Sequence, residues 1–202
     1  QSGHGTVTIG SIEKYITENA WEKGWVKPIE VSYEKKQSVG IIGAGPAGLA
    51  CAEDLRKLGY QITVYDRYDR AGGLLIYGIP NFKLEKYVVT RRTQLLKDSG
   101  INFVQNFEVG RDETLDQLRE KHDVVLIATG VYKPREIELP GSDLHNIFPA
   151  MEFLTASNKK GLGDSVKLFE DGTLNAEGKN VVVIGGGDTA MDCVRTSIRQ
   201  KA

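Results

Sequence analysis

Two glycine-rich turns, each preceded by a run of apolar residues, constrain the fold of this chain more than any other feature. The first run and turn read Val-Gly-Ile-Ile-Gly-Ala-Gly-Pro-Ala-Gly over 39–48, and the second read Val-Val-Val-Ile-Gly-Gly-Gly-Asp-Thr-Ala over 181–190. Each pattern predicts a buried strand, a tight turn and a helix, the unit from which dinucleotide-binding α/β folds are built. We therefore expect an α/β chain with one Rossmann-like dinucleotide-binding domain and the start of a second. Two dinucleotides in one chain indicate electron transfer between them.

The first turn has the spacing G-x-G-x-x-G, in which each glycine has a separate task. Gly43 allows the sharp turn, Gly45 lets a pyrophosphate approach the backbone, and Gly48 lets the helix pack close to the strand. A second strand, expected over 61–66, ends in Asp66, which lies roughly 20 residues beyond the first glycine, where a carboxylate accepts hydrogen bonds from ribose hydroxyls. The context therefore predicts a dinucleotide at this turn rather than a structural turn alone.

The layout of two turns favours FAD in the first site. Gly72 and Gly73 follow Asp66 closely, where the pyrophosphate and ribityl chain of a flavin would run beside the loop. Thr129 and Gly130 end another apolar strand. Because ligands of open α/β sheets bind at the carboxyl ends of the strands, all of these residues are expected at one edge of the sheet.

The second turn has the variant spacing G-x-G-x-x-A, formed by Gly185, Gly187 and Ala190. Asp188 and Thr189 stand at the expected start of the next helix, where the Thr189 hydroxyl can donate to a phosphate. We expect a nicotinamide dinucleotide here, and the alternative is a structural turn without a ligand. The residues that distinguish NADPH from NADH are expected on a later strand, so this sequence does not choose between them.

Apolar periodicity and the positions of glycine and proline predict the remaining elements. Helices are expected over 12–23 (capped by Ser11), 46–58, 84–98, 112–121 and 150–158, and strands over 38–43, 61–66, 101–105, 107–109, 123–128 and 181–184. Residues 27–37 are predicted to be a linker, 67–83 a long functional loop, 131–149 irregular and 159–179 a polar connector. These elements divide the chain into an N-terminal helix and linker (1–37), the first dinucleotide domain (38–150), and a connector with the second unit (151–202). Trp21 and Trp25 either pack on the chain's own core or form a docking surface for another domain or subunit.

Composition excludes several classes of function. The chain has 202 residues, 26 basic and 27 acidic side chains, and a net charge of −1, and without a basic run we expect neither nucleic acid nor an anionic membrane as a partner. No apolar run approaches the roughly 18 residues that a membrane helix needs. Cys51 and Cys193 are too few for a disulfide framework and are expected to be small buried thiols in a reducing, cytoplasmic location. His4, His122 and His145 lack metal-ligand spacing and are expected at the surface, so no metal site is predicted.

Four segments together resemble a known family. They are Gly-Ala-Gly-Pro-Ala-Gly-Leu-Ala over 43–50, Gly-Gly-Leu-Leu-Ile-Tyr-Gly-Ile-Pro over 72–80, Ala-Thr-Gly over 128–130, and Gly-Gly-Gly-Asp-Thr-Ala-Met-Asp-Cys over 185–193. They resemble the small (beta) subunit of bacterial NADPH-dependent glutamate synthase, and the resemblance runs through essentially the whole chain. The same pattern is shared with the N-terminal half of dihydropyrimidine dehydrogenase and with related NADPH-dependent flavin reductases.

The resemblance implies a set of cofactor-binding residues and no catalytic side chain of the acid–base or nucleophilic kind. It places FAD against Gly43, Ala44, Gly45, Pro46, Ala47, Gly48, Asp66, Arg67, Gly72, Gly73, Leu74, Lys83, Val109, Thr129 and Gly130, and NADPH against Gly185, Gly186, Gly187, Asp188 and Thr189.

It also implies a reaction: NADPH transfers a hydride to FAD, and the electrons pass through [4Fe–4S] clusters to a large (alpha) subunit. That partner makes glutamate from 2-oxoglutarate and glutamine. The clusters belong to a cysteine-rich N-terminal region of the family or to the partner, and this chain has no such cysteines.

Three other interpretations remain. The first is a disulfide reductase of the glutathione reductase type, which needs a Cys-x4-Cys pair soon after the double glycine. The residues after Gly73 are Leu-Leu-Ile-Tyr-Gly-Ile-Pro and include no cysteine, which argues against this class of enzyme. A second alternative is another reductase of the same group with a different electron acceptor. The third is a flavin-binding module without turnover of its own, which we expect to describe these residues in isolation.

Overall fold

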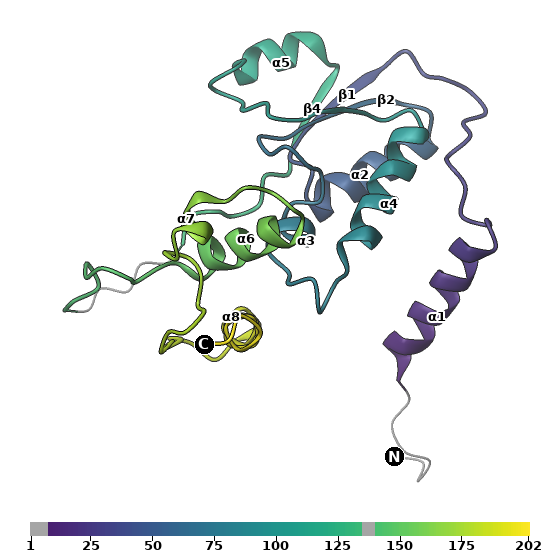
Figure 1. Ribbon diagram of the computed structural model, residues 1–202. Helices are drawn as coiled ribbons and strands as arrows, with labels where there is room; N and C mark the ends of the chain where they lie inside the picture. The colour runs from purple at the N-terminus through teal and green to yellow at the C-terminus, as the bar shows by residue number, and fades with distance from the viewer. Residues whose placement is uncertain (1–7, 135–139) are drawn as a thin grey trace, which may run out of the picture.

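The centre of the molecule is a parallel sheet of four strands. A computed structural model describes residues 8–134 and 140–202. The strands β1 (Ser38–Ile42), β2 (Gln61–Tyr65), β3 (Asn102–Val104) and β4 (Val124–Ile127) lie in the order β3-β2-β1-β4 (Figure 1). This order places β1 in the middle and all carboxyl ends at one edge, which confirms the expected Rossmann-like α/β class.

Helices cover both faces of this sheet. The helices α2 (Pro46–Lys57) and α4 (Lys86–Asp98) lie on one face, and α5 (Leu115–Lys121) lies on the other (Figure 1). The larger core, between the sheet and α2 and α4, is made of Val39, Ile41, Ala44, Leu49, Ala52, Ile62, Val64, Ala71, Leu96 and Ile101. Leu118 of α5 is fully buried against Ile42 and Tyr65 on the opposite face. Burial on both faces explains why the strands read as continuous apolar runs.

The ends of these helices follow local signals in the sequence. Gly59, with φ 88°, ends α2, and Gly100, with φ 85°, ends α4. These are left-handed conformations that favour glycine after a helix. Thr114 and Gln117 form a capping box at the start of α5.

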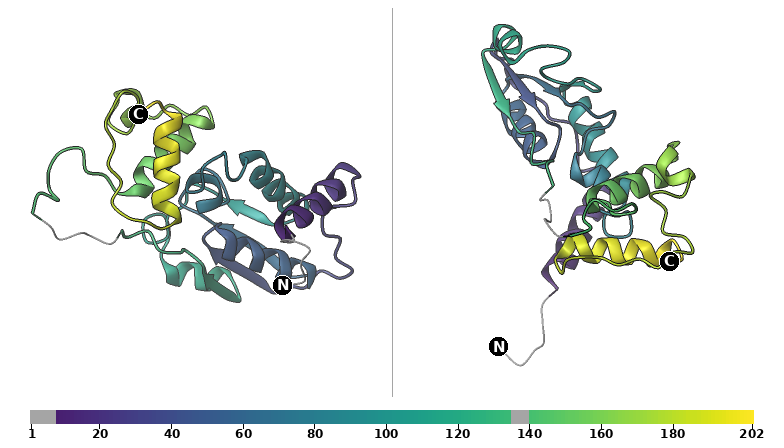
Figure 2. Two further views of the ribbon diagram at one scale, coloured as in Figure 1. Left: turned by 90° about the horizontal axis from the view of Figure 1, so that it is seen from below. Right: turned by 90° about the vertical axis from the view of Figure 1, so that its left-hand side faces the viewer.

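A second group of helices packs beside the first unit. The loop over 67–83 contains a short helix, α3 (Leu74–Tyr77), and the connector contains α7 (Lys167–Glu170). Next to α3 lies α6 (Ala150–Gly161), and α8 (Asp188–Arg199) packs against α6 (Figure 2). The buried Asn158 of α6 donates from Nδ2 to the Tyr77 carbonyl at 2.9 Å, which joins this group to the loop.

The N-terminal segment is attached to the first unit by polar contacts. Helix α1 (Ile9–Glu22) begins three residues before the expected start, with Thr8 rather than Ser11 at its N-cap. Glu18 forms a bidentate pair with Arg91 of α4 at 2.8 and 2.6 Å, and the Arg91 guanidinium lies 4.7 Å from the Trp21 ring centre. Trp25 is 67% exposed. Neither tryptophan therefore belongs to the buried core.

The predicted linker over 27–37 lies against the domain. The buried Arg56 forms an ion pair with Glu34, and the Lys35 amide donates to the Gly59 carbonyl at 2.8 Å.

Two predicted strands are wrong. Residues 181–184 lie in no strand, and Val182 and Ile184 are 87% and 72% exposed. Among the described residues, no strand lies beside this segment, and a strand needs a neighbour to pair its backbone groups. Residues 107–109 form only an isolated bridge, between Val109 and Glu113.

The prediction of a surface position is wrong for His122. It is partly buried, and its Nε2 lies 2.9 Å from the Tyr65 hydroxyl. A Cβ on Gly40 would lie 2.6 Å from His122 Cδ2, so the ring fills space that the missing side chain of Gly40 leaves. His145 is exposed, Cys193 is buried and Cys51 is partly buried, and burial raises the pKa of both thiols.

Some predictions lie partly or wholly outside the described residues. These are the expectations for His4 and for the segments 1–7 and 135–139. The described parts of 131–149 contain no helix or strand before α6, as expected.

Candidate dinucleotide-binding site

The first glycine turn joins β1 to α2, and its three glycines differ sharply in their surroundings. Gly43 has φ 111°, and a Cβ there would lie 2.4 Å from the carbonyl oxygen of Ala128, which directly follows β4. A Cβ on Gly48 would lie 1.9 Å from the Gly43 carbonyl oxygen. A Cβ on Gly45 would meet nothing within 4 Å. Backbone packing thus requires glycine at the first and third positions, whereas the second faces an open cradle that fits a phosphate.

The start of α2 supplies the polar part of this cradle. Gly45 is the N-cap and Pro46 the first helical residue. The first backbone N–H groups of a helix have no partner inside it, so those of Ala47 and Gly48 are free for an anion, and the helix dipole adds positive potential. The Ala44 amide, by contrast, donates to Asp66 at 2.6 Å.

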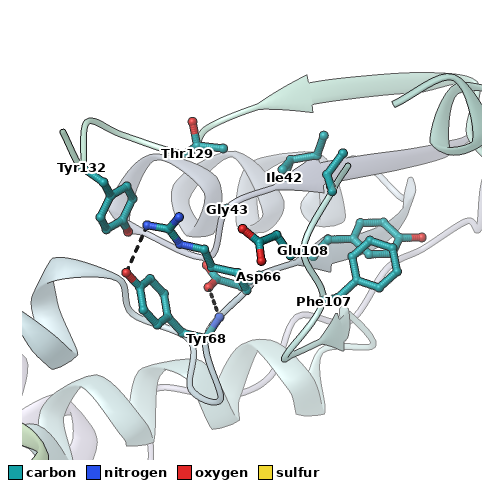
Figure 3. Close-up of a pocket in the computed structure, with 11 residues that line it drawn as sticks. Ile42, Gly43, Asp66, Tyr68, Phe107, Glu108, Thr129 and Tyr132 are labelled. Atoms are coloured by element: carbon teal, nitrogen blue, oxygen red, sulfur yellow. Dashed lines mark hydrogen bonds between the residues drawn. The ribbon is translucent and has the colours of Figure 1, made fainter. Parts of the chain in front are cut away.

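Asp66 is held by the backbone on both sides. It is 7% exposed, and its Oδ2 accepts from Ala44 N at 2.6 Å. Its Oδ1 accepts from Tyr68 N at 2.9 Å (Figure 3). Each carboxylate oxygen has two lone pairs, so one acceptor position on each remains for ribose hydroxyls. The two backbone bonds fix the carboxylate at the carboxyl end of β2.

The double glycine after Asp66 packs directly on the turn. Gly72 N donates to the Ala44 carbonyl at 2.8 Å, and a Cβ on Gly73 would lie 2.8 Å from Gly45 Cα. Their φ values of 128° and 52° also favour glycine. The structure thus brings the loop over 67–83 beside the phosphate cradle.

A pocket of about 250 Å³ opens at the carboxyl ends of β1, β2 and β4 (Figure 3). It is lined by Ile42, Gly43, Tyr65, Asp66, Arg67, Tyr68, Phe107, Glu108, Val109, Thr129 and Tyr132. Of the residues predicted from sequence, Gly43, Asp66, Arg67, Val109 and Thr129 meet here, and Gly130 follows with φ 70°.

Sequence reasoning missed the aromatic residues of this pocket. The Arg67 guanidinium lies 4.3 Å from the Tyr132 ring centre and 5.0 Å from that of Tyr68. Burial raises the pKa of the Tyr132 hydroxyl. Tyr68 and Tyr132 each follow the end of a strand by a few residues, at the edge where ligands bind, and that position is the signal that would have found them.

Lys83 and Leu74 lie away from the pocket lining. Lys83 Nζ lies 3.1 and 3.0 Å from the two carboxylate oxygens of Asp192 on α8. Leu74, at the start of α3, is 46% exposed.

A buried lysine forms hydrogen bonds to the backbone of the loop that carries α3. Lys86 of α4 is 7% exposed, and its Nζ donates to the carbonyls of Leu75, at 3.0 Å, and Ile79. Burial lowers the pKa of Lys86 to about 8. Arg70, which belongs to the same loop, forms a bidentate ion pair with Asp164 of the connector at 2.8 and 2.7 Å.

The second glycine turn leads into α8. Gly185 has φ 135°, and a Cβ on it would lie 3.4 Å from the Ala190 side chain. Added Cβ atoms on Gly186 and Gly187 would meet nothing within 4 Å. Asp188 is the first residue of α8, and the N-cap Gly187 lacks a side chain to occupy the free amides. This end of α8 therefore has the open geometry of an anion site.

Within the described ranges, no helix is long and apolar enough to cross a membrane, and no group of three or more His, Cys, Asp or Glu residues is arranged to hold a metal ion.

The chain is similar to known oxidoreductases. The model of the pyridine nucleotide-disulphide oxidoreductase family matches residues 37–200. The chain is 65% identical over 202 residues to the small chain of glutamate synthase [NADPH] from Azospirillum brasilense, covering 100% of this chain and 42% of that protein. It is 47% identical over 199 residues to the putative oxidoreductase AegA from Escherichia coli, covering 98% of this chain and 30% of that protein. This chain thus spans less than half of the length of these relatives.

A solved structure shows the same fold. Mycobacterium tuberculosis FprA in complex with NADPH superposes with a TM-score of 0.67 at 25% identity, covering 80% of this chain and 36% of that one.

Proposed function

This chain belongs to the pyridine nucleotide-disulphide oxidoreductase family, and from that premise we propose that it forms the FAD site and the start of the NADPH site of a glutamate synthase small subunit. The observation that carries the proposal is the open cradle at Gly45, between two glycines that packing requires. The chain is 65% identical to a glutamate synthase small chain over its full 202 residues, which supports an NADPH-dependent oxidoreductase reaction.

FAD is proposed to lie across the first turn. The amides of Ala47 and Gly48 would bind its pyrophosphate, Asp66 its adenosine ribose, and the loop beginning at Gly72 would follow the flavin side. The pocket beside Arg67 has room for the adenine end. FAD supplies the chemistry, since it accepts a hydride from a nicotinamide and releases electrons one at a time. The chain supplies position and electrostatics.

NADPH is proposed to bind at the second turn. Gly186 and Gly187 leave space for a pyrophosphate, and the first amides of α8, with Thr189, would donate to it. The match to FprA, whose structure was solved in complex with NADPH, supports NADPH as the nicotinamide dinucleotide. Because the segment over 181–184 lies in no strand, we propose that these 202 residues alone do not turn over.

The electrons are proposed to leave through iron–sulfur clusters outside this chain to a large subunit that forms glutamate. A cytoplasmic location belongs to the same proposal. The rival is another reductase of this group with a different acceptor, favoured by the identity of 47% to AegA, a putative oxidoreductase. Purification of the complete subunit from its own cells decides between them, because the rival predicts that no large amidotransferase subunit co-purifies.

The test uses the complete subunit under anaerobic conditions. Rapid mixing with NADPH should bleach the visible absorbance of its bound flavin within the time of one turnover. Replacing Asp66 with Ala should remove most of the bound flavin, whereas the exposed Asp54→Ala control should retain it. A wild-type flavin that NADPH does not bleach contradicts the proposed function, and unchanged flavin content in Asp66→Ala removes Asp66 from the site.

A further inference from the structure

An ion pair joins the two glycine-turn units to each other. Lys83 is the last residue of the loop over 67–83 in the first unit, and Asp192 lies on α8 of the second. The Lys83 ammonium lies 3.0 and 3.1 Å from the two oxygens of the Asp192 carboxylate. The pair thus connects the flavin side of the proposed site to the helix that begins at the proposed NADPH turn.

Asp192 is placed where its partner matters for geometry. It is 6% exposed. A buried carboxylate without a partner is strongly destabilising, so the cation that pairs with Asp192 constrains where α8 can lie. Asp192 is five residues beyond Gly187, which at a rise of 1.5 Å per residue is about 7.5 Å along the helix axis. A displacement of the Lys83–Asp192 ion pair therefore moves the second glycine turn with it.

Lys83 is itself held firmly on the first unit. Its amide donates to the Pro80 carbonyl at 2.9 Å, and the neighbouring Ile79 carbonyl accepts from the buried Lys86. Beside it, the Arg199 guanidinium near the end of α8 lies 3.8 Å from the Phe82 ring centre. Two contacts thus join the same short segment to α8, one at the fifth of its twelve residues and one at the last.

We propose that Asp192 is a positioning residue: through Lys83 it sets the distance between the NADPH turn and the flavin loop for hydride transfer. This inference rests on the proposed function. Three N–H groups on the Lys83 ammonium allow it to bind Asp192 and still donate to the flavin. Hydride transfer depends steeply on the separation of donor and acceptor, so a small displacement of α8 lowers the rate more than it lowers NADPH affinity.

A purely structural ion pair predicts a different result. Loss of such a pair lowers the melting temperature and leaves the properties of the folded fraction unchanged. The distinction lies in the rate of flavin reduction at saturating NADPH, measured on folded subunit that has retained its flavin.

The experiment compares the complete subunit with its Asp192→Asn variant, which keeps the size of the side chain and removes its charge. Stopped-flow absorbance measures the limiting rate of flavin reduction and the NADPH concentration at half-maximal rate. We expect the limiting rate to fall roughly tenfold or more, with flavin content and reduction by dithionite unchanged. The matched control is Lys160→Met, which breaks an exposed pair with Glu170 of the same 3.0 Å length and should leave the rate unchanged.

A charge exchange keeps the proposal falsifiable if Asp192→Asn does not fold. The double variant Lys83→Asp with Asp192→Lys restores the pair in reverse, and it should recover a measurable part of the rate that Lys83→Asp alone loses. A limiting rate in folded Asp192→Asn within twofold of wild type overturns the inference. If the wild-type flavin is not reduced by NADPH at all, the proposed function fails instead.

Discussion

For single residues, the site depends on polar groups that the backbone holds in place. Asp66 accepts from two backbone amides, and Lys86 donates to two carbonyls of the loop that carries α3. Such groups cannot turn toward solvent without breaking buried hydrogen bonds. The glycine spacing predicted Asp66, because Asp66 lies at a fixed distance along the sequence within one strand–turn–helix–strand unit. It gave no signal for Lys86, whose burial depends on contacts between α4 and a distant loop.

Lys86 gives a prediction about pH. Burial lowers its pKa to about 8 from a usual value of 10.5, so the folded chain loses this proton before the unfolded chain does. Between pH 8 and 10.5 the unfolded state binds the additional proton, and the free energy of unfolding therefore rises with pH across this window, by up to about 3 kcal/mol. Lys86→Met removes this contribution. Urea unfolding measures the free energy of unfolding of both proteins. From pH 7.5 to pH 10, the value for wild type should increase relative to that of Lys86→Met.

The exposed Lys27→Met serves as the control for general effects of high pH, and its difference from wild type should stay constant. Parallel pH curves for wild type and Lys86→Met would show that Lys86 titrates normally.

At the scale of elements, the sequence predicted those parts whose signals are local. The first strand, turn and helix, and the ends of α2 and α4 at Gly59 and Gly100, lie within a few residues of expectation. The segment over 181–184 has an equally apolar sequence, but it lies in no strand. A strand also needs a neighbouring strand to pair with, and the local sequence does not say whether one is present. The short helices α3 and α7 were missed because four residues carry too little periodicity.

The first turn supports a paired prediction on two glycines. In Gly48→Ala, the new Cβ would lie 1.9 Å from the Gly43 carbonyl oxygen, so α2 must move away from β1. Overpacking of this kind costs about 1–3 kcal/mol. In Gly45→Ala the new Cβ meets nothing within 4 Å, and φ of −76° suits alanine. This variant should fold as well as wild type but lose FAD affinity, because its methyl group occupies the cradle.

Thermal unfolding of the flavin-free subunits and a flavin titration measure the two effects separately. Equal stability of the two variants would refute the packing argument for Gly48. Equal flavin affinity of Gly45→Ala and wild type would refute the proposal that the open space at Gly45 binds the pyrophosphate.

At the scale of the whole molecule, the two glycine-turn units are connected through a few polar links around α3 and α6. Arg70 pairs with Asp164, Lys83 pairs with Asp192, and Asn158 donates to the Tyr77 carbonyl. These links join segments that are far apart in sequence, which is why residue spacing predicted none of them. Together they constrain where the second turn lies relative to the first, and the proposed hydride transfer between two cofactors would require such a constraint.

Asn158 gives the prediction at this scale. Its side chain is buried, and Asn158→Leu keeps a similar volume but leaves the Tyr77 carbonyl without this donor, which costs about 1–3 kcal/mol. The loss falls between α3 and α6, so hydrogen exchange of both helices should become faster while that of α2 stays unchanged. Asn19 is only partly buried, and its solvent-exposed hydrogen bond to the Tyr15 carbonyl, at 2.8 Å, provides the matched control, because water can replace its amide in Asn19→Leu. Uniform acceleration across α2, α3 and α6 in Asn158→Leu would mean that the two units unfold as one body, and the polar links would then add nothing specific to their relative placement.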